Sequence, residues 1–130
     1  MIILTLRTDK PESEIGIYKQ ATPLAYYSWH AHRQLAETIN KVIEEQLHEQ
    51  GLDYQNIDGI VFYKGPGSFT GLRIGASVVN SLASSLGADI VGSNGEQWIE
   101  DGIIRLQNKQ NDKIIVPEYG ALPNVTAQKK

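Results

Sequence analysis

One segment of the sequence combines glycines, a proline and hydroxyl residues in a spacing that could bind an anion. Residues 64–75 read Lys-Gly-Pro-Gly-Ser-Phe-Thr-Gly-Leu-Arg-Ile-Gly and join a predicted strand to a predicted helix. Free N–H groups at the start of a helix can bind phosphate or another anion. The same residues also fit a tight turn whose glycines supply unusual backbone angles and whose Ser68 or Thr70 caps the helix. Both interpretations stay open, and the candidate residues are Gly65, Pro66, Gly67, Ser68, Thr70, Gly71 and Arg73.

Familiar catalytic motifs do not account for this segment. In a Walker A loop, the tripeptide Gly-Lys-Ser/Thr begins five residues after the first glycine. Here the residue five positions after Gly65 is Thr70, so the motif is missing. Ser68 directly follows Gly67, so the G-x-S-x-G elbow of hydrolases is missing. His30 and His32 alone fall short of the three or four ligands of a metal site, which favours surface or capping roles. We therefore predict no catalytic residue, no metal and no cofactor.

The composition narrows the class of protein. The chain has 130 residues, a net charge of −3 and no cysteine. This length favours one domain with one core. The acidic balance argues against direct binding to phosphate backbones, so any contact with nucleic acid is expected to run through a partner. Without cysteine there is no disulfide, thiolate nucleophile or Cys-ligated zinc. No leader or membrane span is expected, and we predict a cytoplasmic protein with no membrane contact.

Hydrophobic periodicity predicts the elements that position the segment. Short runs predict strands near 2–6, 14–19 and 23–29 in an antiparallel meander. Helical spacing follows over 32–50, then a buried strand over 57–63, a helix over 70–86 ending at Gly87, and a parallel strand over 88–91. A capping box at 93–96 would start a third helix to Leu106, and 114–116 would form a last short strand. This order is typical of an α/β ribonuclease-H/actin-like (ASKHA) single lobe, a mixed five-stranded sheet with helices packed on it.

The predicted helix over 70–86 has an apolar arc wider than a sheet needs. One stripe holds Leu72, Ala76, Val79, Ala83 and Leu86, and a flanking one holds Ile74, Val78 and Leu82. Together they span roughly 200°, against the ~100° that packs on a sheet. Either the first helix covers the second stripe, or that stripe is a surface for a partner.

The segment from Gly65 to Gly75 closely resembles the signature of the TsaB (YeaZ) family, the dimerisation subunits of the bacterial tRNA threonylcarbamoyladenosine system. The order of elements and the residues 116–126 also resemble that family, so the likeness covers most of the chain. Family members usually carry a second actin-like lobe after the third helix. Here a first lobe at 1–107 would be followed by a short junction and an extended tail at 108–130, with the second lobe absent.

The resemblance implies an accessory subunit without catalytic activity. TsaB-like proteins pair with a TsaD-like catalytic subunit through their first two helices, and a TsaE-like ATPase joins them to modify adenosine 37 of tRNA. By position, dimerisation would use the helices over 32–50 and 70–86, and a homodimer is expected in isolation. Contact with tRNA would be indirect. The implied interface residues are Leu35, Ile39, Ile43, Ile74, Val78 and Leu82.

Two departures from related proteins bear on catalysis. The family pattern has an aspartate in the first strand where this chain has Arg7, and an arginine cannot hold Mg²⁺. TsaD-like relatives carry His-x-x-x-His on the first helix, whereas Ala36 lies four residues after His32. The alternatives to an accessory subunit are a small nucleotide-binding actin-like module, a self-associating scaffold without a tRNA-modification role, and a hydrolase using Ser68.

Overall fold

The computed structural model describes residues 1–31 and 34–119. Five strands and three α-helices account for most of them, in the order that the hydrophobic pattern predicts. They are β1 (Ile2–Arg7), β2 (Glu12–Lys19), β3 (Thr22–His30), α1 (Leu35–Glu49), a short 3-10 turn η2 (Tyr54–Asn56), β4 (Ile57–Tyr63), α2 (Phe69–Leu86), β5 (Asp89–Ser93) and α3 (Trp98–Gln107).

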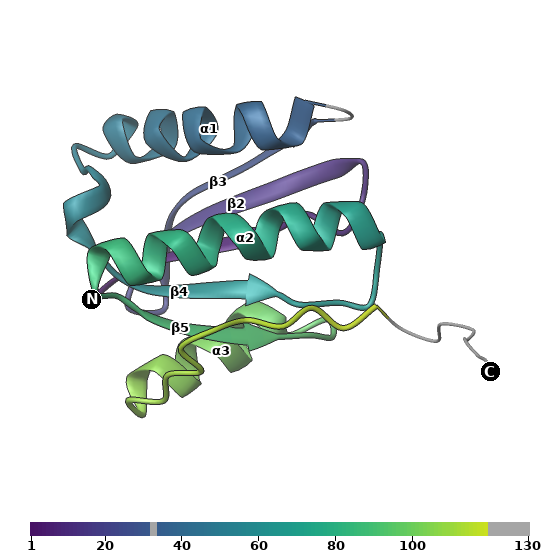
Figure 1. Ribbon diagram of the computed structural model, residues 1–130. Coiled ribbons are helices and arrows are strands. Elements are labelled where there is room, and N and C mark those ends of the chain that lie inside the picture. Colours follow the sequence, from purple (N-terminus) through teal and green to yellow (C-terminus); the bar gives the residue numbers. More distant parts are fainter. Residues whose placement is uncertain (32–33, 120–130) are drawn as a thin grey trace.

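The strands form one mixed sheet in the order β3-β2-β1-β4-β5. Strands β1, β2 and β3 are antiparallel neighbours, whereas β4 runs parallel to both β1 and β5. Helices α1 and α2 lie on one face and α3 lies on the other (Figure 1). The predicted meander, parallel crossover and mixed five-stranded sheet are therefore confirmed.

The alternation of side chains along β4 shows how the two layers are held. Phe62 is fully buried beneath α2, where a Cβ on Gly75 would lie 2.7 Å from its ring. The next side chain back, Val61, points to the other face, where it lies under Gly102 of α3. Because successive side chains of a strand point to opposite faces, this one strand supports helices on both sides of the sheet.

Two local predictions are wrong. Ser93 does not cap a helix, because it pairs with Tyr63 as the last residue of β5. Helix α3 begins later, at Trp98, after Gln97, which makes no side-chain cap. Residues 114–116 form no strand, because the peptide groups of Ile115 bond to the side chain of Asn80 on α2, at 3.1 and 2.8 Å.

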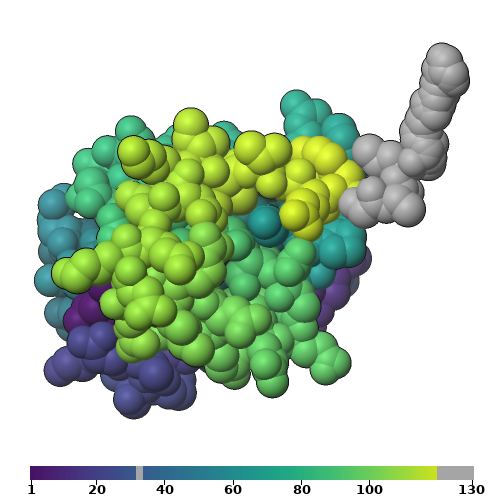
Figure 2. All heavy atoms as spheres, turned by 90° about the horizontal axis from the view of Figure 1, so that it is seen from below, coloured from purple at the N-terminus to yellow at the C-terminus, as the bar shows by residue number. Residues whose placement is uncertain are grey.

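Residues 108–119, which we call the strap, run from α3 across the outer edge of β5. Side-chain oxygens of Asn111 and Asp112 accept the N–H groups of Ile90 and Gly92 at 3.2 and 2.9 Å. The Asp112 N–H donates to the Ile90 carbonyl at 2.7 Å. Figure 2 shows the strap as a yellow-green band along this face. The strap thus occupies hydrogen-bonding groups that would otherwise leave β5 as an open edge.

Replacing Asp112 with asparagine is expected to loosen the strap in a pH-dependent way. Burial alone would raise the pKa of Asp112, but the Gly92 N–H and the Arg105 guanidinium favour the charged form and lower it. A pKa that is lower in the folded than in the unfolded state stabilises the fold at pH values above the ordinary aspartate pKa of ~4. This stabilisation is lost as the pH falls through the folded-state pKa of Asp112.

We expect Asp112→Asn to lower the free energy of unfolding by about 1 kcal/mol at pH 6. This difference should shrink when urea unfolding is repeated near pH 3. A difference from wild type that is equal at both pH values would contradict a role for the Asp112 charge.

Candidate functional site

The loop between β4 and α2 is a capped turn held on the turn between β1 and β2. Ser68 is the N-cap of α2, and its hydroxyl accepts the Gly71 N–H at 3.4 Å. The Ser68 N–H donates to the Asp9 carbonyl at 2.9 Å. The Thr8 hydroxyl donates to the Gly71 carbonyl at 2.7 Å. These bonds fix the start of α2 above the end of β1.

Close approach explains two of the glycines in this loop. A Cβ on Gly71 would lie 2.0 Å from the backbone oxygen of Thr8, and one on Gly67 would lie 2.4 Å from the Asp9 Cβ. The sequence predicted that Gly67 serves an unusual backbone angle, but its role is to leave space. Gly65 does have such an angle, with φ +127°, and the strap carbonyl of Glu118 occupies the place of its Cβ. It precedes Pro66 through a cis peptide bond.

The geometry favours the cap over the anion site. The N–H groups of Ser68, Gly71 and Leu72 already donate to protein oxygens. Thr70 and Arg73 lie exposed on the first turns of α2, facing outward.

An ion pair occupies the end of β1. The Arg7 guanidinium donates two hydrogen bonds of 2.8 Å to the Asp9 carboxylate, whose side chain is only 6% exposed. Arg7 also lies 4.0 Å above the ring of Tyr63 and 5.8 Å from that of Trp98. The bond to Asp9 raises the pKa of Arg7 further, against the effect of burial. Because the Asp9 carboxylate is already bonded to Arg7, this site is unsuited to binding a divalent cation.

The predicted interface residues divide into two groups. Leu35, Ile39 and Ile43 on α1 are 5%, 0% and 0% exposed, so their assignment to a partner surface is corrected. They pack inward because the apolar stripe of α1 covers the sheet. On α2, Ile74, Val78 and Leu82 are only partly buried against the core.

A groove between α1 and α2 brings the accessible part of this surface together. It has a volume of about 410 Å³ and is lined by Ala36, Thr70, Arg73, Ile74, Ser77 and Val78. The two helices lie side by side over the sheet (Figure 1). Small residues on both walls leave the apolar side chains of Ile74 and Val78 within reach of another helix. Two lining residues are not among the predicted ones: Ser77, which helical spacing places beside the flanking stripe of α2, and Ala36, which comes from α1.

An aromatic pair also escaped the sequence analysis. Phe69 is 50% exposed and contacts Tyr119 of the strap, with ring centroids 4.4 Å apart. The Arg73 guanidinium lies 5.3 Å from the Phe69 ring. No sequence spacing could reveal this contact, because Phe69 lies in the signature segment and Tyr119 lies far along the chain, at the end of the strap.

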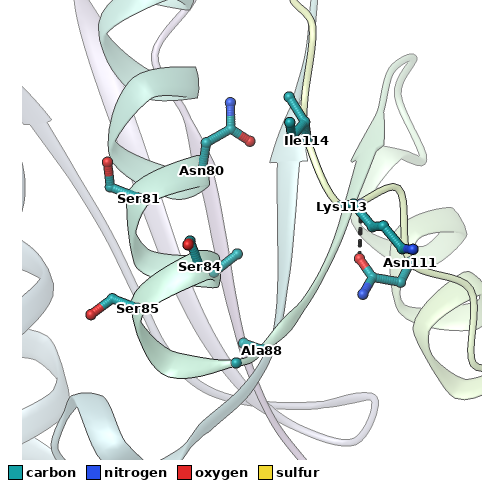
Figure 3. A pocket seen from close by; sticks show the side chains of 10 residues that line it. Asn80, Ser81, Ser84, Ser85, Ala88, Asn111, Lys113 and Ile114 are labelled. Carbon is teal, nitrogen blue, oxygen red and sulfur yellow. Dashed lines mark hydrogen bonds between the residues drawn. The ribbon is translucent and has the colours of Figure 1, made fainter.

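A second groove lies at the other end of α2, between this helix and the strap (Figure 3). It has a volume of about 840 Å³, with Asn80, Ser81, Ser84 and Ser85 on one wall and Asn111, Lys113 and Ile114 on the other. The Asn111 side chain accepts the Lys113 N–H at 2.9 Å, and so bonds within its own wall. The lining holds one ionisable side chain, which offers little for catalysis.

Neither a metal site nor a membrane span is found where the chain is described. Within residues 1–31 and 34–119, no three His, Cys, Asp or Glu side chains cluster in a way that could hold a metal ion. No helix in those ranges has the length and apolar character needed to cross a bilayer. The prediction for His32 lies outside the described residues.

Comparison with known proteins identifies the group to which this fold belongs. A family model described as TsaD, tRNA N6-adenosine threonylcarbamoyltransferase, matches residues 29–121. The chain is 41% identical over 64 residues to the tRNA N6-adenosine threonylcarbamoyltransferase of Geotalea uraniireducens, covering 49% of this chain and 19% of that protein. It is 29% identical over 112 residues to the threonylcarbamoyladenosine biosynthesis protein TsaB of Bacillus subtilis, covering 80% and 48%.

A solved structure agrees with these relatives. YeaZ from Pseudomonas aeruginosa superposes with a TM-score of 0.68 at 25% identity, over 82% of this chain and 50% of that one. The predicted actin-like fold class is thereby confirmed. The chain spans at most about half the length of the curated relatives described above. Because the family model matches more than half of the chain and TsaB and YeaZ recur among its relatives, the chain belongs to the TsaD-type family, in its TsaB (YeaZ) group.

Proposed function

We propose that this chain is a non-catalytic subunit that binds a TsaD-like catalytic subunit and supports threonylcarbamoylation of adenosine 37 in tRNA. The observation that carries the proposal is the accessible apolar groove between α1 and α2 in a member of the TsaB group. In this proposal the partner's helices cover Ile74 and Val78, and Leu82 extends the contact along α2. Leu35, Ile39 and Ile43 support the surface from within the core.

The residues at the ends of the strands support a role without catalysis. Arg7 stands at the position where related proteins have an aspartate, and it forms an ion pair with Asp9. The two charges therefore neutralise each other. The Ser68 hydroxyl caps α2 by accepting the Gly71 N–H at 3.4 Å, a contact with the backbone rather than with a base. A nucleophilic serine needs a neighbouring base. These contacts disfavour both the nucleotide-binding module and the hydrolase.

Further parts of the proposal concern the assembly. A TsaE-like ATPase would join the complex, and tRNA would be contacted through the catalytic subunit, since this chain carries a net charge of −3. We place the assembly in the cytoplasm, where tRNA is modified.

The test is co-purification with the TsaD-like protein of the same organism, followed by an assay of threonylcarbamoyladenosine in tRNA. We expect a stable complex, and modification that depends on adding this chain to the other components. The chain alone should turn over neither ATP nor peptide. A TsaD-like protein that modifies tRNA equally well without this chain, and does not bind it, would refute the proposal.

A further inference from the structure

Strand β3 forms the end of the sheet opposite to β5, and within residues 1–31 and 34–119 it pairs with β2 alone. Its aromatic side chains are accessible, with Tyr26 49% and Tyr27 44% exposed. Tyr27 stacks on Trp29, with ring centroids 6.4 Å apart and an angle of 15° between their planes. An edge strand presents unpaired N–H and C=O groups that can pair with another strand.

The register of β2 and β3 indicates which peptide groups face outward. The Ala31 N–H donates to the Pro11 carbonyl at 3.3 Å, just beyond the pairing of Ser13 with Trp29. In an antiparallel pair, hydrogen-bonded and non-bonded residues alternate along each strand. Trp29 and Tyr27 therefore bond to β2, whereas the peptide groups of Tyr26 and Ser28 point away from it.

Natural proteins protect such edges with charged side chains, and β3 has none. Its sequence, Thr-Pro-Leu-Ala-Tyr-Tyr-Ser-Trp-His, contains no Asp, Glu, Lys or Arg. Two copies of β3 could therefore approach each other without repulsion between permanent charges, even though the chain carries a net charge of −3. Proline occurs only at Pro23, near the start of the strand, away from Tyr26 and Ser28.

The opposite edge determines what kind of pairing is possible. Asn111 and Asp112 of the strap already occupy the N–H groups of Ile90 and Gly92 on β5. A head-to-tail contact of β3 with β5, which would continue into a filament, is therefore blocked. Pairing of β3 with β3 is self-complementary and closes after one partner.

We propose that β3 is a second interaction surface, at which two copies of this chain pair antiparallel through β3 to form one continuous sheet. In the proposed register Tyr27 lies on the two-fold axis, and the outward groups of Tyr26 and Ser28 pair with each other. It places Tyr26 opposite the partner's Ser28, each pair exchanging its N–H···O bonds, and Tyr27 opposite the partner's Tyr27. Trp29 then faces the partner's Ala25, which extends the row of apolar contacts on the α1 side. This surface is separate from the groove between α1 and α2, and the inference does not depend on the proposed function.

The first test removes one outward N–H group. Ser28→Pro deletes a donor that does not bond to β2, and edge strands tolerate proline at such positions. Ser28→Thr is the matched control because it keeps the N–H. By sedimentation velocity, wild type and Ser28→Thr should dimerise as the concentration rises, whereas Ser28→Pro should raise the dissociation constant about tenfold or more. Hydrogen exchange at Tyr26 and Ser28 should slow with concentration in wild type.

A second variant leaves the backbone intact, in case proline disturbs folding. Tyr27→Lys places like charges opposite each other across the two-fold axis, whereas Tyr27→Phe keeps the aromatic contact. We expect the lysine variant to be monomeric with an unchanged circular dichroism spectrum, and the phenylalanine variant to dimerise. A wild-type chain that stays monomeric, or a dimer unaffected by Tyr27→Lys but lost in Val78→Glu, would overturn the inference. The latter result would place self-association in the helix groove and leave the proposed function standing.

Discussion

Replacing Val78 with glutamate is expected to abolish binding to the TsaD-like partner while the chain stays folded. Val78 lines the groove on α2, where it is partly buried against the core and partly accessible. A partner helix that covers this position would bury the carboxylate without a compensating charge. We expect the dissociation constant to rise by at least about 100-fold, measured by titration calorimetry against the purified partner.

The matched control for this variant is Ser84→Glu. Ser84 is an exposed residue of the same helix and lines the separate groove beside the strap. The Ser84→Glu variant adds the same charge to α2 away from the proposed contact, so it should bind the partner with wild-type affinity. Circular dichroism would show whether both variants keep their helices. A folded Val78→Glu chain with wild-type affinity would refute the assignment of the groove.

Replacing Gly71 with alanine is expected to destabilise the fold strongly. The new Cβ would lie 2.0 Å from the backbone oxygen of Thr8, a group that cannot rotate away as a flexible side chain could. Moving α2 away from β1 would also break the bond from the Thr8 hydroxyl to the Gly71 carbonyl. We expect a loss of about 3 kcal/mol in the free energy of unfolding, measured with urea.

Gly87→Ala provides the comparison for this prediction. Gly87 ends α2 with φ +67°, and nothing lies within 4 Å of the place where its Cβ would be. The variant suffers only the backbone strain of a left-handed residue, about 1 kcal/mol. If Gly71→Ala proves no more destabilising than Gly87→Ala, the close approach of α2 to β1 would be contradicted.

The regular elements could be predicted because their evidence is local. The spacing of Leu35, Ile39, Ile43 and Leu47 marks a helix wherever that helix packs, and short apolar runs mark the strands. Which side of α1 is buried by the chain itself could not be predicted in the same way. An apolar stripe indicates only that something covers it, and here the chain's own sheet does so.

Contacts between side chains and backbone groups that lie far apart along the chain could not be predicted from the sequence. The strap is held by Asn80, Asn111 and Asp112, whose partners lie 20 to 35 residues away. Polar residues of this kind give no periodic signal. The pair of Arg7 and Asp9 did offer a clue that the sequence analysis passed over, because residues two apart along an extended chain share a face.

The turn at 108–109, where α3 ends and the strap begins, gives this architecture room to vary. Lys109 lies exposed at its tip, while the chain on either side is anchored separately, by Leu106 in the core and by Asp112 on β5. Exposed tips whose flanks hold their own places accept long insertions with little cost to the fold. A whole additional domain could be spliced in at Lys109 and return to the same anchor. Evolution, or an engineer, could therefore lengthen or shorten the molecule here while keeping the sheet unchanged.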